Sequence, residues 1–421
     1  MALRLFHGIC LTAFLNRFVM ISAISAAAVP DPDYWKPDLS PDLTVPVARP
    51  LLPTLADFAP YLRRIEHNRW YSNGGPLIQE FEARLELKMG GGAARVATVS
   101  NATVGLALAM MAQGAGTGGM TPGALCMMPA WTFAATAHAA RVAGLVPWLV
   151  DVDPLTWTLE APAARELLRQ APGPVAAVVP VAPFGQPIDV AAWEAFGDET
   201  GIPVVIDGAA AFDAVCASNV PAVVSLHATK AMGIGEGGFV TSNDGAVIDE
   251  IRRLANFGFW NSREATTHGL NGKLSEYAGG IGLAALDLWP EMRGALLRVG
   301  GSYRAALLPG GEVTLQPGFA EDWVSSTVMI SVPGVGGGAV SRALSAIGIG
   351  TRRWWGGGLH RHAAFRDCPR GTTTATDALA VATVGLPCWP DLPDDVIDQV
   401  CAVVSAVTAE VVTTGEPVAA A

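Results

Sequence analysis

One lysine of this chain stands where it could do chemistry. The chain has four lysines, Lys36, Lys88, Lys230 and Lys273, and residues 225–244 read SLHATKAMGIGEGGFVTSND. Lys230 thus lies between hydroxyl and imidazole side chains and a glycine-rich run. A lysine in a largely apolar site is desolvated, so its pKa falls and its neutral amine becomes a nucleophile. The natural use of such an amine is a Schiff base with a carbonyl, either of a substrate or of pyridoxal phosphate.

Pyridoxal phosphate needs three further kinds of group, and the sequence offers candidates for each. Its pyridine nitrogen needs a carboxylate, and Asp207 ends the apolar run VVID. Its phosphate needs hydroxyls and the backbone amides of a helix N-terminus. The candidates for the phosphate are Asn101, Ala102, Thr103 and Ser225. Its ring needs a flat side chain, for which Phe133 in PAWTFAAT is preferred to Trp131.

Each of these features also has a purely structural interpretation. A strand-end aspartate such as Asp207 is often a helix cap or a turn residue. Asn101 could be a plain N-cap, and an aromatic residue after proline usually belongs to the core. A lysine before a glycine-rich turn is usually solvated. What favours a cofactor site is the order along the chain, in which phosphate-binding candidates come first and are followed by the aromatic residue, the aspartate and the lysine.

The elements that would position these residues form an α/β pattern. From about residue 95, short apolar runs such as RVATVS and VPWLVDVD alternate with helical stretches. This alternation predicts a mostly parallel sheet covered by helices on both faces, with ligands at the carboxyl ends of the strands. A smaller α+β unit follows a break near residues 309–318. The predicted organisation is a leader over 1–45, a large cofactor-binding domain over 46–308, a small domain over 309–408 and a tail over 409–421.

Composition excludes several classes of function. The chain has 421 residues, a net charge of −11 and no segment that concentrates Lys and Arg, so neither nucleic acid nor a membrane surface is expected as a partner. The scattered cysteines show no metal-binding spacing, which favours reduced thiols in the cytoplasm. The first residues resemble a signal peptide, yet Arg17 interrupts the apolar run and Met20 could be the true start. We therefore expect a cytoplasmic protein without a bound metal.

At this point the sequence resembles a known family. The lysine segment, VSNATVGLALAM, MPAWTFAATAHAARVAG and HGLNGKLSEYAGGIGLAALD look like segments of the DegT/DnrJ/EryC1/StrS aminotransferases, and the resemblance covers roughly residues 60–405. It implies a fold-type I pyridoxal-phosphate enzyme. It also implies transfer of an amino group from an amino acid, L-glutamate being the expected donor, to the keto group of a nucleotide-linked sugar. The family further implies a homodimer with shared active sites.

Carried over by position, the resemblance assigns a role to each candidate residue. Lys230 would form the Schiff base, Asp207 would pair with the pyridine nitrogen, and Phe133 would stack on the ring. The phosphate would be bound by Ala102, Thr103 and Ser225, and by Asn271 reaching in from the neighbouring subunit. The structural alternative for Asn271 is a cap on a helix that starts near Lys273.

Some features of the sequence leave its function open. Ala210 stands where the family usually has Gln or His, and Ala102 stands where Gly is usual. The alternatives are therefore a transaminase of a non-sugar ketone, such as a cyclitol, or a catalytically idle binding or regulatory protein of this fold. His227 is expected to brace the lysine loop rather than to act as a base. A further segment could line the acceptor site or form a surface turn, and it holds Arg352, Arg353, Trp354, Trp355 and His360.

Overall fold

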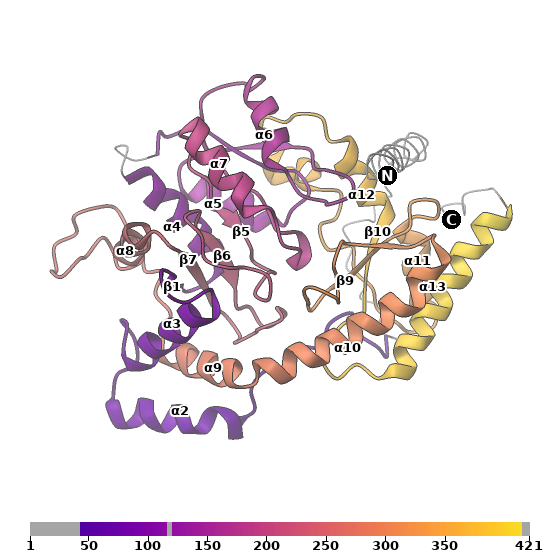
Figure 1. Cartoon of the computed structure of the whole chain (residues 1–421), viewed down its shortest axis with the longest axis horizontal. Coiled ribbons are helices and arrows are strands. Elements are labelled where there is room, and N and C mark those ends of the chain that lie inside the picture. The colour runs from indigo at the N-terminus through magenta and orange to yellow at the C-terminus, as the bar shows by residue number, and fades with distance from the viewer. Residues whose placement is uncertain (1–42, 116–119, 415–421) are drawn as a thin grey trace, which may run out of the picture.

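The computed structural model describes residues 43–115 and 120–414. Figure 1 shows a large sheet wrapped by helices and a smaller C-terminal unit beside it. Helix α9 (Glu276–Asp287) runs beneath the large sheet, and helix α10 (Trp289–Leu307) continues beneath the C-terminal unit. This architecture confirms the predicted α/β class. The predicted leader lies almost wholly outside the described residues, as do the alternative start and most of the predicted tail.

The large sheet is built from two hydrogen-bonded groups of strands. One group has the order β3-β2-β4 and the other β1-β7-β6-β5. Two parallel bridges, Val178 with Val204 and Val181 with Asp207, join β4 to β5. The strands are β1 (Arg95–Val99), β2 (Leu125–Pro129), β3 (Val146–Val150), β4 (Val175–Val178), β5 (Ile206–Asp207), β6 (Ala222–Ser225) and β7 (Gly238–Ser242). All pairs are parallel except those that β7 makes with β1 and β6.

Helices cover this sheet, and local sequence explains where they begin and end. In α2 the Thr54 and Asp57 side chains form a capping box, and in α7 Asp189 caps the N-terminus while Gly201 ends the helix in the left-handed conformation. Helix α4 is apolar around most of its circumference and packs on β6 and β7. The helices are α2 (Leu55–Asn68), α3 (Pro76–Lys88), α4 (Ala102–Ala115), α5 (Ala134–Val142), α6 (Ala161–Leu168), α7 (Val190–Thr200), α8 (Gly245–Leu254) and α9 (Glu276–Asp287).

The C-terminal unit holds a small antiparallel sheet with the order β10-β9-β8. Its elements are α10 (Trp289–Leu307), β8 (Thr314–Leu315), β9 (Val328–Ser331), α11 (Gly337–Ser345), α12 (Thr374–Ala382), β10 (Thr383–Leu386) and α13 (Asp394–Thr414). Helix α13 continues past residue 408, where the small domain was predicted to end. It packs against α10 and α11, and the buried side chains between them include Leu296, Val340 and Val400.

Two segments cross between the predicted domains. Val45 pairs with Ile349, and the Val47 carbonyl accepts a hydrogen bond from the Cys388 amide, so the chain before α2 lies with the C-terminal unit. In return, the amide of Leu149 in β3 donates to the Pro369 carbonyl. Residues 359–371 therefore lie against the large sheet. The domain boundaries expected at 46, 308 and 408 stay a prediction.

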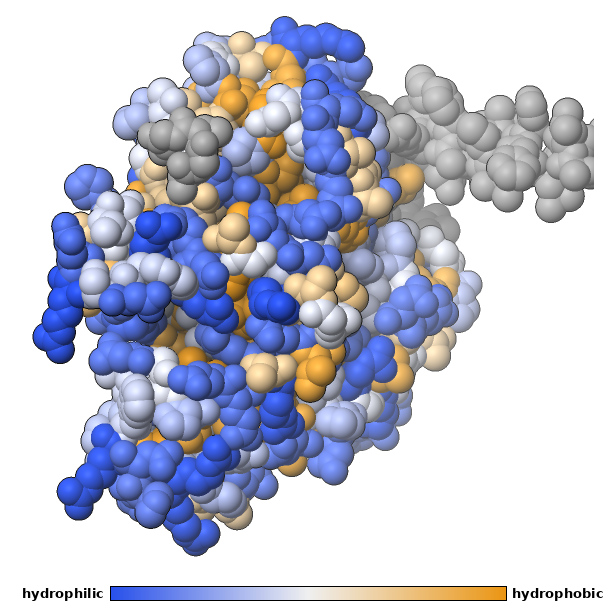
Figure 2. Space-filling model, turned by 60° about the vertical axis from the view of Figure 1, so that its left-hand side comes forward, coloured by the Kyte–Doolittle hydropathy of each residue, from blue (hydrophilic) through white to orange (hydrophobic). Residues whose placement is uncertain are grey.

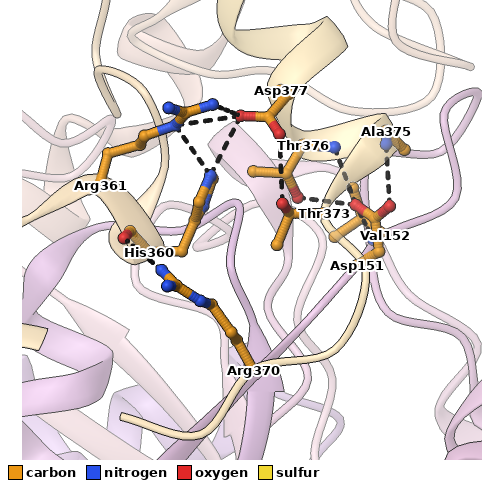
Figure 3. A network of polar contacts seen from close by, with 9 residues as sticks. All are labelled: Asp151, Val152, His360, Arg361, Arg370, Thr373, Ala375, Thr376 and Asp377. Carbon is orange, nitrogen blue, oxygen red and sulfur yellow. Dashed lines mark hydrogen bonds and ion pairs between the residues drawn. The ribbon is translucent and has the colours of Figure 1, made fainter. Parts of the chain in front are cut away.

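A polar network ties the two units together (Figure 3). Asp151, which directly follows β3, accepts hydrogen bonds from the backbone amides of Ala375 and Thr376, each at 2.8 Å, and so caps α12. In the first turn of the same helix, Asp377 pairs with Arg361 at 2.7 Å and with His360 at 3.0 Å. Partial burial acts to raise the pKa of Asp377, but the bonds from His360 and Arg361 outweigh it and lower that pKa to about 2.

The outer surface is mostly polar. Figure 2 shows a face on which hydrophilic side chains predominate and hydrophobic ones appear mainly in hollows between them. No helix among residues 43–115 and 120–414 is both long enough and apolar enough to cross a membrane.

Candidate active site

Asp207 is held at the carboxyl end of the large sheet by its backbone and by its side chain. Its amide donates to the Pro180 carbonyl, and its own carbonyl accepts from the Ala182 amide, both at 2.9 Å. The residue is 5% exposed. One carboxylate oxygen accepts from the Thr136 hydroxyl at 2.7 Å and the other from the Ala209 amide at 3.1 Å. The carboxylate is therefore fixed in both position and orientation.

Asp207 and Lys230 influence each other's ionisation. Burial raises the pKa of the Asp207 carboxyl, whereas the hydrogen bonds from Thr136 and Ala209 and the nearby Lys230 charge lower it. Burial likewise lowers the pKa of the Lys230 amine, and the Asp207 charge opposes that effect. The whole Lys230 residue is partly exposed. Its amine thus loses its proton more easily than that of an ordinary lysine, which makes it a better nucleophile at a given pH.

The turn that carries Lys230 is braced on both sides. Nδ1 of His227 lies 2.9 Å from the Thr229 hydroxyl and accepts a hydrogen bond from the Thr229 amide at 3.2 Å. From the C-terminal unit, the Ser326 hydroxyl donates to the Thr229 carbonyl at 2.7 Å. The His227 side chain therefore makes the bracing contacts expected from the sequence. Nothing in the sequence singled out Ser326, because a serine about a hundred positions away carries no local signal.

Three of the residues predicted to bind phosphate, Asn101, Ala102 and Thr103, lie at the start of α4. Ala102 is the first residue of this helix, and the Asn101 side chain accepts from the Val104 amide at 3.0 Å. Asn101 is therefore an N-cap, as the structural alternative required, and its amide nitrogen stays available to a ligand. A Cβ added at Gly238 would come within 2.9 Å of the Ala102 nitrogen, so β7 approaches this turn closely. Ser225, at the end of β6, is buried, and its hydroxyl accepts from the His227 amide at 3.2 Å.

The two aromatic candidates for the ring contact differ sharply in exposure. Phe133 occupies the N-cap position of α5 and is 61% exposed, whereas Trp131 is 2% exposed. Trp131 makes an edge contact with Trp355, which in turn stacks on Phe184 with ring centroids 3.9 Å apart. Trp131 is thus a packing residue. Of the two side chains, only Phe133 can present its ring to a ligand.

The segment around residues 352–360 divides between the two interpretations. Arg352 is exposed and lies over the Trp354 ring at 4.7 Å, as in a surface turn. Trp355 reaches the large domain through Phe184 and Trp131. His360 is 7% exposed and pairs with Asp377. A role of this segment at an acceptor site stays a prediction.

Asn271 lies on the surface, beside the turn at the start of α4 that is predicted to bind phosphate. The carbonyl of its neighbour Gly272 accepts from the Ser100 amide at 2.7 Å, and Asn271 itself is exposed. The alternative role of Asn271 as a helix cap is wrong. Helix α9 begins at Glu276, and the Ser275 side chain caps it by accepting from the Ala278 amide.

Thr136 is a further residue beside the candidate site that the sequence analysis missed. Its signal was available in TFAAT, where it falls three residues after Phe133 and hence on the same side of the first helical turn. Ala210 stands at the position that departs from the family, and the backbone of Gly185 packs directly against it. A Cβ added at Gly185 would come within 2.8 Å of the Ala210 carbonyl oxygen.

The chemistry of these donors fits pyridoxal phosphate. A buried carboxylate suits a protonated pyridine nitrogen, a desolvated amine suits the aldehyde, and a helix N-terminus beside a buried hydroxyl suits the phosphate. The donor set is therefore suited to an organic cofactor held by a lysine and an aspartate. Among the described residues, no cluster of three or more His, Cys, Asp or Glu side chains could hold a metal ion.

Comparison with known proteins identifies a family of aminotransferases. Residues 55–405 match the DegT/DnrJ/EryC1/StrS aminotransferase family. The protein Rv3402c of Mycobacterium tuberculosis is 33% identical over 252 residues, which cover 58% of this chain and 60% of that protein. The chain therefore spans less than two thirds of the length of this curated relative.

Two further relatives have names that state a function or a ligand. A dTDP-4-amino-4,6-dideoxy-D-glucose transaminase of Escherichia coli is 30% identical, over 66% of this chain and 73% of that enzyme. The crystal structure of DesI in the presence of its TDP-sugar product superimposes with a TM-score of 0.77 at 30% identity, over 94% of this chain and 98% of that one. With the match over residues 55–405, these likenesses show that the chain belongs to the DegT/DnrJ/EryC1/StrS aminotransferase family.

Proposed function

We propose that this protein is a pyridoxal-phosphate-dependent aminotransferase. It moves an amino group from an amino acid, L-glutamate, to the keto group of a nucleotide-linked sugar. The observation that carries the proposal is the pair formed by Lys230 and Asp207 at the carboxyl edge of the large sheet, where each group shifts the pKa of the other. Membership of an aminotransferase family supports it.

The proposed chemistry divides between cofactor and protein. Bound pyridoxal phosphate supplies an electron sink that stabilises negative charge on the α-carbon of the donor. Lys230 supplies an amine that is neutral more often than an ordinary lysine at the same pH, because burial lowers its pKa. Lys230 would hold the cofactor through its aldehyde carbon, and its free amine would serve as the base that takes a proton from the donor α-carbon and gives it back.

Other residues of the chain would hold the cofactor. Asp207, fixed by Thr136 and Ala209, would keep the pyridine nitrogen protonated. Phe133 would contact one face of the ring. The phosphate would be bound by the backbone amides of Ala102 and Thr103, by the Asn101 amide and by the Ser225 hydroxyl. An ion at that position would also face the positive end of the α4 dipole.

The substrate class rests on relatives rather than on a described pocket. The names of two related proteins refer to a dTDP-linked amino sugar and to a TDP-sugar product. A third relative, a UDP-2-acetamido-2-deoxy-3-oxo-D-glucuronate aminotransferase of Pseudomonas aeruginosa, is 29% identical over 78% of this chain. All three names carry nucleotide sugars, so we propose a nucleotide-linked keto sugar as the acceptor here. A cytoplasmic location also stays a prediction.

We further propose a homodimer with shared active sites. Asn271 is exposed beside the start of α4. Because Ser275 caps α9, the Asn271 side chain does not serve as the cap of that helix. Several aromatic side chains near the same elements are 43–47% exposed, which is typical of surfaces that pack against a partner. These side chains are Trp70, Tyr71, Phe257, Trp260 and Tyr277.

The decisive experiment is a visible absorbance spectrum of the purified protein before and after addition of L-glutamate. We expect a yellow band from lysine-bound cofactor that bleaches when the donor transfers its amino group. A band that persists with every amino acid tried would instead indicate an idle binder. No band, even with added pyridoxal phosphate, would overturn the proposal.

The acceptor is tested with a panel of keto compounds added to the bleached protein. Return of the yellow band with a nucleotide-linked keto sugar supports the proposal, whereas return only with a cyclitol ketone would place the enzyme in the non-sugar class. Lys230→Ala is the control. We expect it to fold and to show no multiple turnover, and measurable multiple turnover in that variant would refute the role of the lysine.

A further inference from the structure

Two buried threonine hydroxyls lie in line with the Asp207 carboxylate. The Thr136 hydroxyl is 2.7 Å from one carboxylate oxygen, and the Thr132 hydroxyl is 2.9 Å from that of Thr136. Both threonines are 1% exposed. They come from one short stretch, in which Thr132 directly precedes the N-cap of α5 and Thr136 lies in the first turn of the helix.

The direction of these two hydrogen bonds follows from counting protons. An ionised carboxylate can only accept, so the single hydroxyl proton of Thr136 is donated to Asp207. In its contact with Thr132, Thr136 must therefore accept, and the Thr132 hydroxyl donates. Both dipoles then point their positive ends toward the carboxylate, an arrangement in which each bond strengthens the other.

Three groups stabilise the negative charge of Asp207, and Thr136 is the one that donates a hydrogen bond from its side chain. The stabilising groups are the Thr136 hydroxyl, the Ala209 amide and the charge of Lys230. The amide belongs to the backbone, and no substitution of a side chain removes it. Lys230 is the charged group that acts on Asp207 among the described residues.

We propose that Thr136, supported by Thr132, is a positioning residue that holds the buried Asp207 carboxylate ionised and oriented. It thereby sets the pH range over which the site binds pyridoxal phosphate. The part that concerns the cofactor rests on the proposed function. The part that concerns ionisation does not, and it can be measured on the cofactor-free protein.

The first test compares urea unfolding of cofactor-free protein with that of Thr136→Val, a change that removes the hydroxyl and conserves shape. At a pH where Asp207 is protonated in both proteins, the variant loses only one neutral hydrogen bond. As the pH rises through the folded-state pKa of Asp207, the variant must also carry a charge without its side-chain donor. We therefore expect a fall in the unfolding midpoint that grows as the pH is raised across the range in which the parent protein stays folded, and that is at least twice as large at the highest pH as at the lowest.

The same comparison in an Asp207→Asn background isolates the charge. There the effect of Thr136→Val should become independent of pH, because no ionisable group remains for the hydroxyl to stabilise. An effect of equal size at the two pH values in the parent background would overturn the proposal. So would a pH-dependent effect that persists in the Asp207→Asn background.

The second test is titration of the cofactor-free protein with pyridoxal phosphate at about pH 6 and about pH 8. Thr136→Val should weaken binding on the order of tenfold, as for the loss of one hydrogen bond to a charged group, and more at the lower pH, where its carboxyl is more often protonated. Thr136→Ser should restore binding to within about twofold, and Thr132→Val should fall between, since only the supporting donor is lost. Serine and valine variants that bind equally poorly would show that the methyl group matters and would overturn the inference. If the parent protein binds no cofactor, the proposed function fails, yet the unfolding measurements still decide the role of Thr136.

Discussion

Asp151→Ala removes the acceptor that holds the first turn of α12 to the large sheet. The carboxylate accepts from the Ala375 amide, the Thr376 amide and the Thr376 hydroxyl, each at 2.8 Å. Ala375 is partly exposed, so water can replace its lost bond at about 0.5–1 kcal/mol. Thr376 is 0% exposed, so its donors would be left buried and unpaired at about 1–3 kcal/mol. The expected loss of unfolding free energy is therefore about 1.5–4 kcal/mol.

Urea unfolding followed by circular dichroism measures this loss. Asp151→Asn keeps one accepting oxygen and should cost about half as much. The matched control is Asp189→Ala, because Asp189 caps α7 within the large domain through one exposed hydrogen bond, accepted from the Ala192 amide at 3.0 Å. That change should cost about 1 kcal/mol or less. A result in which Asp151→Ala is no more destabilising than this control would refute the reasoning that Asp151 joins the two units by accepting several hydrogen bonds from buried donors.

Three further changes separate packing from ligand contact. Trp131→Ala should cost about 3–5 kcal/mol of stability because the side chain is buried; Phe133→Ala should leave urea stability nearly unchanged and weaken cofactor binding, and the reverse pattern would exchange their roles. Competitive acylation read by mass spectrometry should show Lys230 titrating below the usual lysine range, and Asp207→Asn should lower its midpoint further because the opposing charge is gone; an unchanged or higher midpoint would contradict the pairing. Gly238→Ala places a Cβ 2.9 Å from the Ala102 nitrogen and the Val224 oxygen and should weaken binding of pyridoxal phosphate, whereas Gly245→Ala, with no atom within 4 Å of the added Cβ, should not.

Sequence pattern predicted the alternating core of the fold well because buried parallel strands are short and continuously apolar. RVATVS, ALCMMPA and VPWLVDVD appear as β1, β2 and β3. The run IPVVIDGA is less regular than expected: β5 has two residues, while Val204 pairs with Val178 of β4. A strand that divides its hydrogen bonds between two neighbours in this way cannot be distinguished from a continuous strand by apolar periodicity alone.

The candidate site was predictable where a residue type is required by its chemistry and unpredictable where a residue acts through another. A nucleophilic lysine and a buried carboxylate must be Lys and Asp or Glu, so Lys230 and Asp207 stood out. Thr136 and Ser326 supply a hydroxyl to a neighbour, and many positions of a chain could do so. Their roles depend on distances of 2.7 Å that only the folded backbone sets.

Residues 359–371 return from the C-terminal unit to the large sheet, a path that the sequence did not predict. GGGLHRHAAFRDCPRG has neither helical nor strand periodicity, so its sequence indicated only a turn. In the fold, the Leu359 amide donates to the carbonyl of Ala130, next to Trp131, and the Gly371 amide donates to that of Leu149 in β3. An unpaired edge strand invites association with other chains, and this segment covers the edge of β3. The same path brings Trp355 against the aromatic residues beside the site and leaves Arg352 outside. Of the residues predicted for an acceptor site, Trp355 is therefore the one whose substitution is expected to change acceptor binding, and Arg352 is its natural control.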